Sequence, residues 1–229
     1  MKNKIVNYII ESNKRSAQNR KEYSFDNGYV FIKDELPEDI DVQYVIDTVQ
    51  ELVPLHLRAG VETIMVGNFE ELEERELDAF YKDGAVYLTN DQNNNEDMID
   101  DIVHEMAHAL EEERGYEIYV DDDDIETEFR EKRKVLESLL NRAGFDTEEH
   151  DFDDIEFNQE FDEYLLNTIG YETLELIVVG LFPDAYSPTS IREYFATGFD
   201  KYFLGDRDYL KKVSPALYRK IKELVEDDS

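Results

Sequence analysis

The sequence predicts an α+β fold, with a small mixed sheet and one long helix in the N-terminal half and a helical C-terminal half. Three observations support this class. Short segments rich in β-branched and aromatic residues lie between residues 28 and 90. Residues 91–115 carry apolar side chains at helical spacing, and helical patterns return from residue 164 onward. A chain of 229 residues with 41% hydrophobic side chains has enough apolar material for one domain core.

The domain is expected to span residues 26–229. The preceding residues 1–25 are polar and mixed in charge, which is typical of a loose arm or of a helix packed on the domain. Residues 116–163 change character, because acidic runs at 121–124 and 146–157 flank an amphipathic piece. We interpret this stretch as an acidic, partly helical insertion. The run at 121–124 lacks the glycine turn and the final glutamate of a calcium loop, so we expect it to be solvated.

The segments before the long helix alternate between strand and helix patterns. Residues 28–33 (GYVFIK) predict a short strand. Residues 41–57 place apolar side chains at helical spacing, and residues 61–69 are rich in strand-forming side chains. Residues 78–90 predict two strands joined by an Asp-Gly pair, which favours a tight two-residue turn.

Residues 91–115 predict a well-formed amphipathic helix. Asparagines at its start can cap the free main-chain N–H groups, acidic residues occupy the first turn, and Gly115 is expected to end the helix. The apolar side chains form one continuous face, made of Met98, Ile99, Ile102, Val103, Met106, Ala109 and Leu110.

This helix carries the pattern His-Glu-x-x-His at residues 104–108. Side chains four residues apart lie on the same helix face, so His104 and His108 can bind one ion. Glu105 lies about 100° around the helix, where it can reach a water on that ion without binding the ion itself. Zinc lowers the pKa of such a water, and the glutamate can accept its proton as the water attacks a peptide carbonyl. The pattern predicts a zinc peptidase with Glu105 as general base.

The alternative is that the two histidines make ordinary hydrogen bonds in the core or at the surface. The position of the motif favours the metal site. The predicted strand AVYLT (85–89) comes directly before the helix, and a peptidase needs a strand edge that can hold an extended substrate by main-chain pairing.

A third ligand must come from elsewhere in the chain. A motif continued by Gly at position 111 and His at position 114 would supply it locally, but these positions hold Glu and Arg. We prefer Glu193 in the segment IREYFATGF, whose aromatic residues can pack its helix against the motif helix. His150 and Asp200 are the alternatives. Three protein ligands would leave one position of the zinc ion open for water.

The motif His104-Glu105-x-x-His108 and the downstream segment AYSPTSIREYFA together resemble the catalytic domain of the anthrax lethal factor family, which includes clostridial Pro-Pro endopeptidases. The resemblance implies a zincin-like metallopeptidase fold and a zinc ion held by His104, His108 and Glu193. In that family a tyrosine seven residues before the glutamate ligand faces the zinc. Tyr186 stands at this spacing, which implies that it donates a hydrogen bond to the oxyanion of the tetrahedral intermediate.

The resemblance covers residues 40–115 loosely and residues 184–225 more closely. The family usually has a second glutamate four residues after the ligand, and here that position is Thr197. A glutamate at this position would support the ligand through a hydrogen bond, and Thr197 in its place leaves this support of Glu193 open. The gap between the motif and Glu193 is also longer than in the family, which agrees with an insertion at 116–163.

The charge of the chain limits its partners. With 57 acidic and 24 basic residues the net charge is −33, which repels phosphate backbones and anionic membranes. We therefore expect neither a nucleic acid nor a membrane as partner, and we expect polypeptide substrates with basic, extended segments. The chain has no cysteine, so disulfides and thiolate metal sites are excluded.

No segment is typical of a secretory signal or of a membrane-spanning helix, so a cytoplasmic location is expected. The sequence does not indicate the oligomeric state. Two other functions stay open. One is an acidic binding or structural protein, for example of phage origin, that keeps a zincin scaffold. The other is an acidic mimic of nucleic acid that binds DNA-binding proteins.

Overall fold

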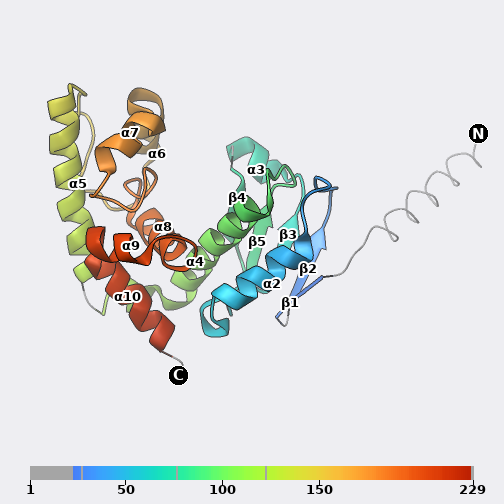
Figure 1. The fold of residues 1–229 in the computed structure, drawn as a ribbon. Helices are drawn as coiled ribbons and strands as arrows, with labels where there is room; N and C mark the ends of the chain where they lie inside the picture. Colours follow the sequence, from blue (N-terminus) through green and yellow to red (C-terminus); the bar gives the residue numbers. More distant parts are fainter. Residues whose placement is uncertain (1–22, 27, 76, 122, 228–229) are drawn as a thin grey trace, which may run out of the picture.

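The computed structural model describes residues 23–26, 28–75, 77–121 and 123–227, which form a sheet half and a helical half joined by the long helix α4 (Figure 1). This arrangement confirms the predicted α+β class. Within the segment expected as an arm or a helix, residues 23–25 form a strand, and residues 1–22 lie outside the described part of the chain.

The described strands form one five-stranded mixed sheet in the order β1-β2-β3-β5-β4. The strands are β1 (Tyr23–Phe25), β2 (Gly28–Ile32), β3 (Thr63–Val66), β4 (Ala79–Lys82) and β5 (Ala85–Leu88). The three inner strands are parallel, and each edge strand is antiparallel to its neighbour. Asp83 and Gly84 join β4 to β5 with φ angles of 50° and 81°, the left-handed conformation that a tight hairpin turn requires.

The predicted position of the sheet edge is wrong by one strand. The segment AVYLT contains β5, which lies between β3 and β4, so the edge beside the long helix is β4. The reason is the tight hairpin, since it folds β4 back onto the outer side of β5.

Helices α2 (Val42–Leu52) and α4 (Asn95–Tyr119) cover one face of the sheet and pack against each other. The side chains of Val30, Ile64 and Val86 pair across neighbouring strands on this face and are buried. The short helix α3 (Glu70–Arg75) follows β3.

Helix α4 begins as expected, because the Asn94 side chain accepts a hydrogen bond from the Asp97 amide at 2.8 Å. Gly115, however, does not end it. The helix bends at Arg114, whose φ and ψ are −121° and 18°, and then continues to Tyr119.

The helical half contains α5 (Asp124–Ala143), α6 (Gln159–Glu163), the π-helical turn η2 (Tyr164–Ile169), α7 (Tyr171–Val178), α8 (Ile191–Phe203), α9 (Arg207–Val213) and α10 (Pro215–Glu226). Helix α8 packs against α4, and α10 packs against α5, α8 and α9. None of the described helices is both long and apolar enough to cross a membrane.

Helix α5 lies within the segment expected as an acidic insertion, and it contributes to the main core. Phe129, Leu136 and Leu140 on this helix are completely buried. The Glu128 carboxylate accepts hydrogen bonds from the Ala216 amide at 2.9 Å and the Leu217 amide at 3.2 Å. It therefore satisfies main-chain N–H groups that have no partner within the first turn of α10.

The guanidinium of Arg133, also on α5, is buried and connects three segments. It lies 3.9 Å from the ring centroid of Phe161 and donates hydrogen bonds to the main-chain oxygens of Asp151 and Asp154, both at 3.2 Å. It also donates to the main-chain oxygen of Pro188, directly before α8. Helix α5 therefore fixes the start of the helix that carries Glu193.

Candidate metal centre

Helices α4 and α8 bring His104, His108 and Glu193 to one point, where their ligand-type atoms lie within 4.8 Å of one another. Oε2 of Glu193 lies 3.2 Å from Nε2 of His104 and 3.7 Å from Nε2 of His108. With zinc–ligand bonds of about 2.0–2.2 Å in a tetrahedron, neighbouring ligand atoms are about 3.3 Å apart. The three side chains can therefore hold a metal ion of this size with little movement.

The start of α8 determines where Glu193 lies. Oγ of Ser190 accepts a hydrogen bond from the Glu193 amide at 3.2 Å, which caps the helix three residues before the carboxylate. Tyr194 and Phe195 follow directly and are completely buried, so they hold the helix against the core. A Cβ atom at Gly198 would overlap the side chain of Leu217, so this glycine allows α10 to approach α8 closely.

Each imidazole of the pair has a carboxylate behind it. Nδ1 of His104 lies 2.8 Å from Oδ2 of Asp200, and Nδ1 of His108 lies 2.7 Å from Oε2 of Glu111. A carboxylate accepts hydrogen bonds, so each Nδ1 carries a proton, and each Nε2 is turned toward Glu193, where a bound metal would replace its proton. Asp200, expected as an alternative ligand, is thus placed on the opposite side of the ring from Glu193.

Glu111 was not expected in the site. Its side chain is almost completely buried, and it accepts hydrogen bonds from the Tyr119 hydroxyl and from Nε of Arg192 at 3.4 Å. The sequence signal that could have revealed it is its spacing, since an acid three residues after His108 lies on the same helix face.

The three candidate ligands lie in a negative electrostatic environment. Burial by itself lowers the pKa of His104, but Asp200 and Glu193 raise it well above its ordinary value. Burial likewise opposes protonation of His108, and Glu111 and Glu193 raise its pKa to about 9. Burial raises the pKa of Glu193, but the hydrogen bond with His104 and the positive charges of the two imidazoles outweigh it and hold the pKa well below the usual range. The same field that attracts protons to the rings would attract a divalent cation.

Glu105 lies beside the three candidate ligands and is not one of them. Its side chain is buried, with 6% of the residue exposed, and it lies near the main chain of Tyr81 on β4. Burial raises the pKa of its carboxyl, although the two histidines lower it in part. A carboxylate with a raised pKa is suited to accepting and returning a proton near neutral pH.

Tyr186 lies in the loop between α7 and α8. Its main-chain amide donates to Oδ1 of Asp184 at 3.0 Å, which fixes the loop. Burial and the negative charges of Glu193 and Asp162 raise the pKa of its hydroxyl. The phenol therefore keeps its proton and remains a hydrogen-bond donor.

Two further predicted positions lie elsewhere. The ring of His150 stacks on Tyr164 with centroids 3.9 Å apart, which places it in an aromatic cluster outside the group of three candidate ligands. Oγ1 of Thr197 lies 2.7 Å from Oγ of Ser187, so this side chain supports the loop before α8. The carboxylate on α8 that supports a histidine is Asp200.

Comparisons with known proteins found no family model, no curated protein and no solved structure that matches the chain.

Proposed function

We propose that the chain is a zinc-dependent endopeptidase with a zincin-like fold that hydrolyses extended polypeptides. The observation that carries the proposal is the meeting of His104, His108 and Glu193, with Glu105 beside them and outside the ligand group. Two imidazoles and one carboxylate are a donor set found in catalytic zinc sites, where three protein ligands leave a position open. Zinc bound there would polarise a water molecule and the carbonyl of the scissile peptide.

Glu105 would act as general base and then as general acid. Its carboxylate would accept a proton from the attacking water and return it to the nitrogen of the leaving amine. The main chain of Tyr81 on β4 supports this role, because it lies near the carboxylate and favours its ionised form.

The substrate would lie along β4. The Thr89 amide donates to the Asp78 oxygen at 2.8 Å, and this register turns the main-chain groups of Ala79 and Tyr81 away from β5, toward the free edge. Helix α4 packs against β4, so a peptide paired with this edge would pass close to the motif helix.

Tyr186 would donate its hydroxyl proton in a hydrogen bond to the oxyanion of the tetrahedral intermediate. Two observations support this role, namely the charge interactions of its hydroxyl with Glu193 and Glu105 and the raised pKa that keeps it protonated. The role agrees with the spacing that resembles the lethal factor family.

The net charge of −33 favours substrates with basic segments. Cleavage of a Lys/Arg-rich peptide library should be faster than cleavage of an Asp/Glu-rich library, and the difference should shrink at high salt. Equal rates at low salt would refute the preference for basic substrates but would leave the proposed mechanism of hydrolysis unaffected.

The decisive experiment combines metal analysis with two variants. The purified chain should contain about one zinc per molecule and cleave peptides. Glu105→Gln should keep the metal and lose at least about a thousandfold in rate, whereas Glu193→Gln should bind zinc much more weakly. An unmodified chain that binds no zinc, or a fully active Glu105→Gln variant, would refute the proposal.

The acidic composition also supports a second function, in which the chain keeps the zincin scaffold but serves to bind a basic partner. Partner binding of this kind would be unaffected in Glu105→Gln. A mimic of nucleic acid would in addition compete with DNA for a DNA-binding protein, even after the metal is removed.

A further inference from the structure

The sheet has an outer face, turned away from α2 and α4, that is rich in aromatic side chains. One cross-strand row on this face runs Phe31, Met65, Tyr87 and Phe80, from β2 to the edge strand β4. Tyr29 lies on the same face two residues before Phe31, and the two are 68% and 38% exposed. Together with Phe69, these residues are called the outer aromatic face below.

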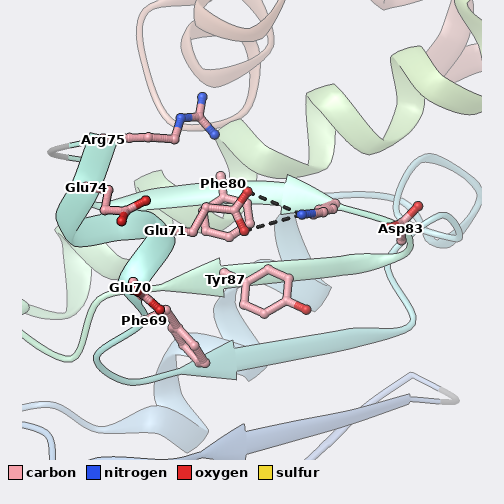
Figure 2. A pocket seen from close by; sticks show the side chains of 9 residues that line it. Phe69, Glu70, Glu71, Glu74, Arg75, Phe80, Asp83 and Tyr87 are labelled. Carbon is pink, nitrogen blue, oxygen red and sulfur yellow. Dashed lines mark hydrogen bonds and ion pairs between the residues drawn. The ribbon is translucent and has the colours of Figure 1, made fainter.

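The end of this face near β4 opens into a pocket of about 640 Å³ beside α3 (Figure 2). The Tyr87 ring stacks on Phe80 with centroids 4.7 Å apart and lies nearly perpendicular to the Phe69 ring, with centroids 5.2 Å apart. The acidic side chains Glu70, Glu71 and Glu74 of α3 also line the pocket.

Two lysines of the chain show which chemistry this surface accepts. Nζ of Lys82 lies 3.3 Å from both carboxylate oxygens of Glu71, and Nζ of Lys33 lies 4.7 Å from the centroid of Phe69. Carboxylates and aromatic faces both attract ammonium groups. The surface therefore suits a segment that combines apolar side chains with lysines or arginines.

The N-terminal residues have this composition. Residues 1–22 contain six basic and two acidic side chains, a net charge of +4, whereas the chain as a whole carries −33 and residues 23–229 therefore carry −37. The run IVNYII at 5–10 supplies the apolar side chains. Opposite charge and shared apolar character make this segment complementary to the outer aromatic face.

The place where residues 1–22 join the sheet allows them to reach the outer aromatic face. Tyr23 pairs with Val30, so the chain enters the sheet beside Phe31, at the start of the aromatic row. Four strands about 4.8 Å apart make the row about 14 Å long, while 22 residues reach about 33 Å as a helix and about 70 Å when extended. We propose that residues 1–22 dock in cis on the outer aromatic face, with basic side chains in the pocket beside α3.

This contact lies on the opposite face of the sheet from α4, so it does not rest on the proposed hydrolysis. It would cover the exposed ring of Tyr29 and neutralise part of the negative charge of α3. The other occupants of such a surface, a second copy of the chain or a different protein, are distinguished by the experiment.

The test is zero-length carbodiimide cross-linking of the full chain, using a mixture of ¹⁴N- and ¹⁵N-labelled protein analysed by mass spectrometry. Lysines of residues 1–22 should form links to Glu70, Glu71 or Glu74 within one chain, and these links should weaken strongly in high salt. The Lys82–Glu71 pair serves as an internal positive control.

The variant Tyr29→Ala/Phe31→Ala should reduce the N-terminal links at least fivefold while the Lys82–Glu71 link remains, which shows that the sheet is intact. The matched control Leu176→Ala/Val179→Ala removes side chains that are 78% and 68% exposed on α7 and at its end, and it should leave the links unchanged. Links spread over acids of both halves, links between labelled and unlabelled chains, no links, or links that survive the Tyr29/Phe31 variant would each overturn the proposal.

Discussion

Oδ2 of Asp200 lies 2.8 Å from Nδ1 of His104, while Oε2 of Glu193 lies 3.2 Å from Nε2 of the same ring. Asp200 and Glu193 are seven residues apart on α8, which is about two helical turns. One helix thus supplies a carboxylate on each side of one imidazole. Glu111 gives His108 the equivalent support from within α4. Both rings are therefore held with the same nitrogen toward Glu193.

The supporting carboxylates should control metal affinity. Asp200→Asn and Glu111→Gln leave all three candidate ligands in place but remove the charge that fixes the imidazole proton on Nδ1. We expect zinc affinity to fall about 10- to 100-fold in each variant. Titration against a competing chelator measures this, with Glu175→Gln at an exposed position of α7 as a control that removes the same charge. Unchanged affinity in both variants would show that the two carboxylates do not support the site.

Tyr186→Phe should separate catalysis from metal binding. The variant keeps the ring and removes the hydroxyl that would stabilise the oxyanion, so kcat should fall by about a hundredfold. Zinc content should remain the same, because Tyr186 is not in the ligand group. Steady-state kinetics on one peptide together with metal analysis test both statements, and a kcat within twofold of the unmodified chain would contradict the assigned role.

Arg133→Met should destabilise the helical half. The change leaves the main-chain oxygens of Asp151, Asp154 and Pro188 without their buried donor, which we expect to lower the free energy of unfolding by about 3–5 kcal/mol. Urea denaturation measures the effect. Arg142→Met on the exposed end of α5 is the control, and its effect should stay within about 0.5 kcal/mol.

Asp101→Asn should stabilise the fold at neutral pH. Burial raises the pKa of Asp101 to about 6, above its ordinary value of 3.8, so the folded chain binds this proton more tightly than the unfolded chain. Above pH 6 the ionised carboxylate therefore lowers stability, and this loss disappears as the pH falls toward 3.8. We expect the variant to gain about 1–2 kcal/mol at pH 7.5, after allowing for partial exposure, and almost nothing below pH 4.

Asparagine at position 101 keeps an oxygen that can accept the hydrogen bond from Nε2 of Gln92, which is 3.1 Å from the carboxylate. Unfolding curves at several pH values test the prediction. Glu175→Gln again removes one exposed charge and should change stability by less than about 0.5 kcal/mol at each pH. A gain in Asp101→Asn that does not depend on pH would argue against a raised pKa.

The group of three candidate ligands could be predicted because its signals are local. The spacing of His104 and His108 places both rings on one helix face, and the aromatic residues after Glu193 indicate a buried helix. The strand and helix patterns predicted β2, α2, β3, β4 and β5 for the same reason, since a period of two or of 3.6 residues survives in the sequence, whereas α3 was not predicted.

Other features depend on tertiary packing, and the sequence does not reveal them. Asp200 is one of 57 acidic residues, and only the packing of α8 on α4 shows that its carboxylate meets an imidazole. The order of β4 and β5 in the sheet follows from the direction in which a hairpin folds, which its turn residues do not specify. The acidic composition of residues 116–163 indicates an insertion, yet Lys132 and Arg133 within this stretch are buried.

Arg133 holds segment 151–154 through contacts that do not involve the charged side chains of this segment. The guanidinium binds main-chain oxygens, which every amino acid possesses, so this anchor does not itself depend on the charge of the loop's side chains. Asp153 lies between the anchored positions, and its carboxylate forms an ion pair with Lys134 near the surface. A neutral or basic residue at position 153 should therefore leave the start of α8 unchanged. Natural variation or design can therefore change the electrostatic potential around the helical half without moving the backbone next to Tyr186.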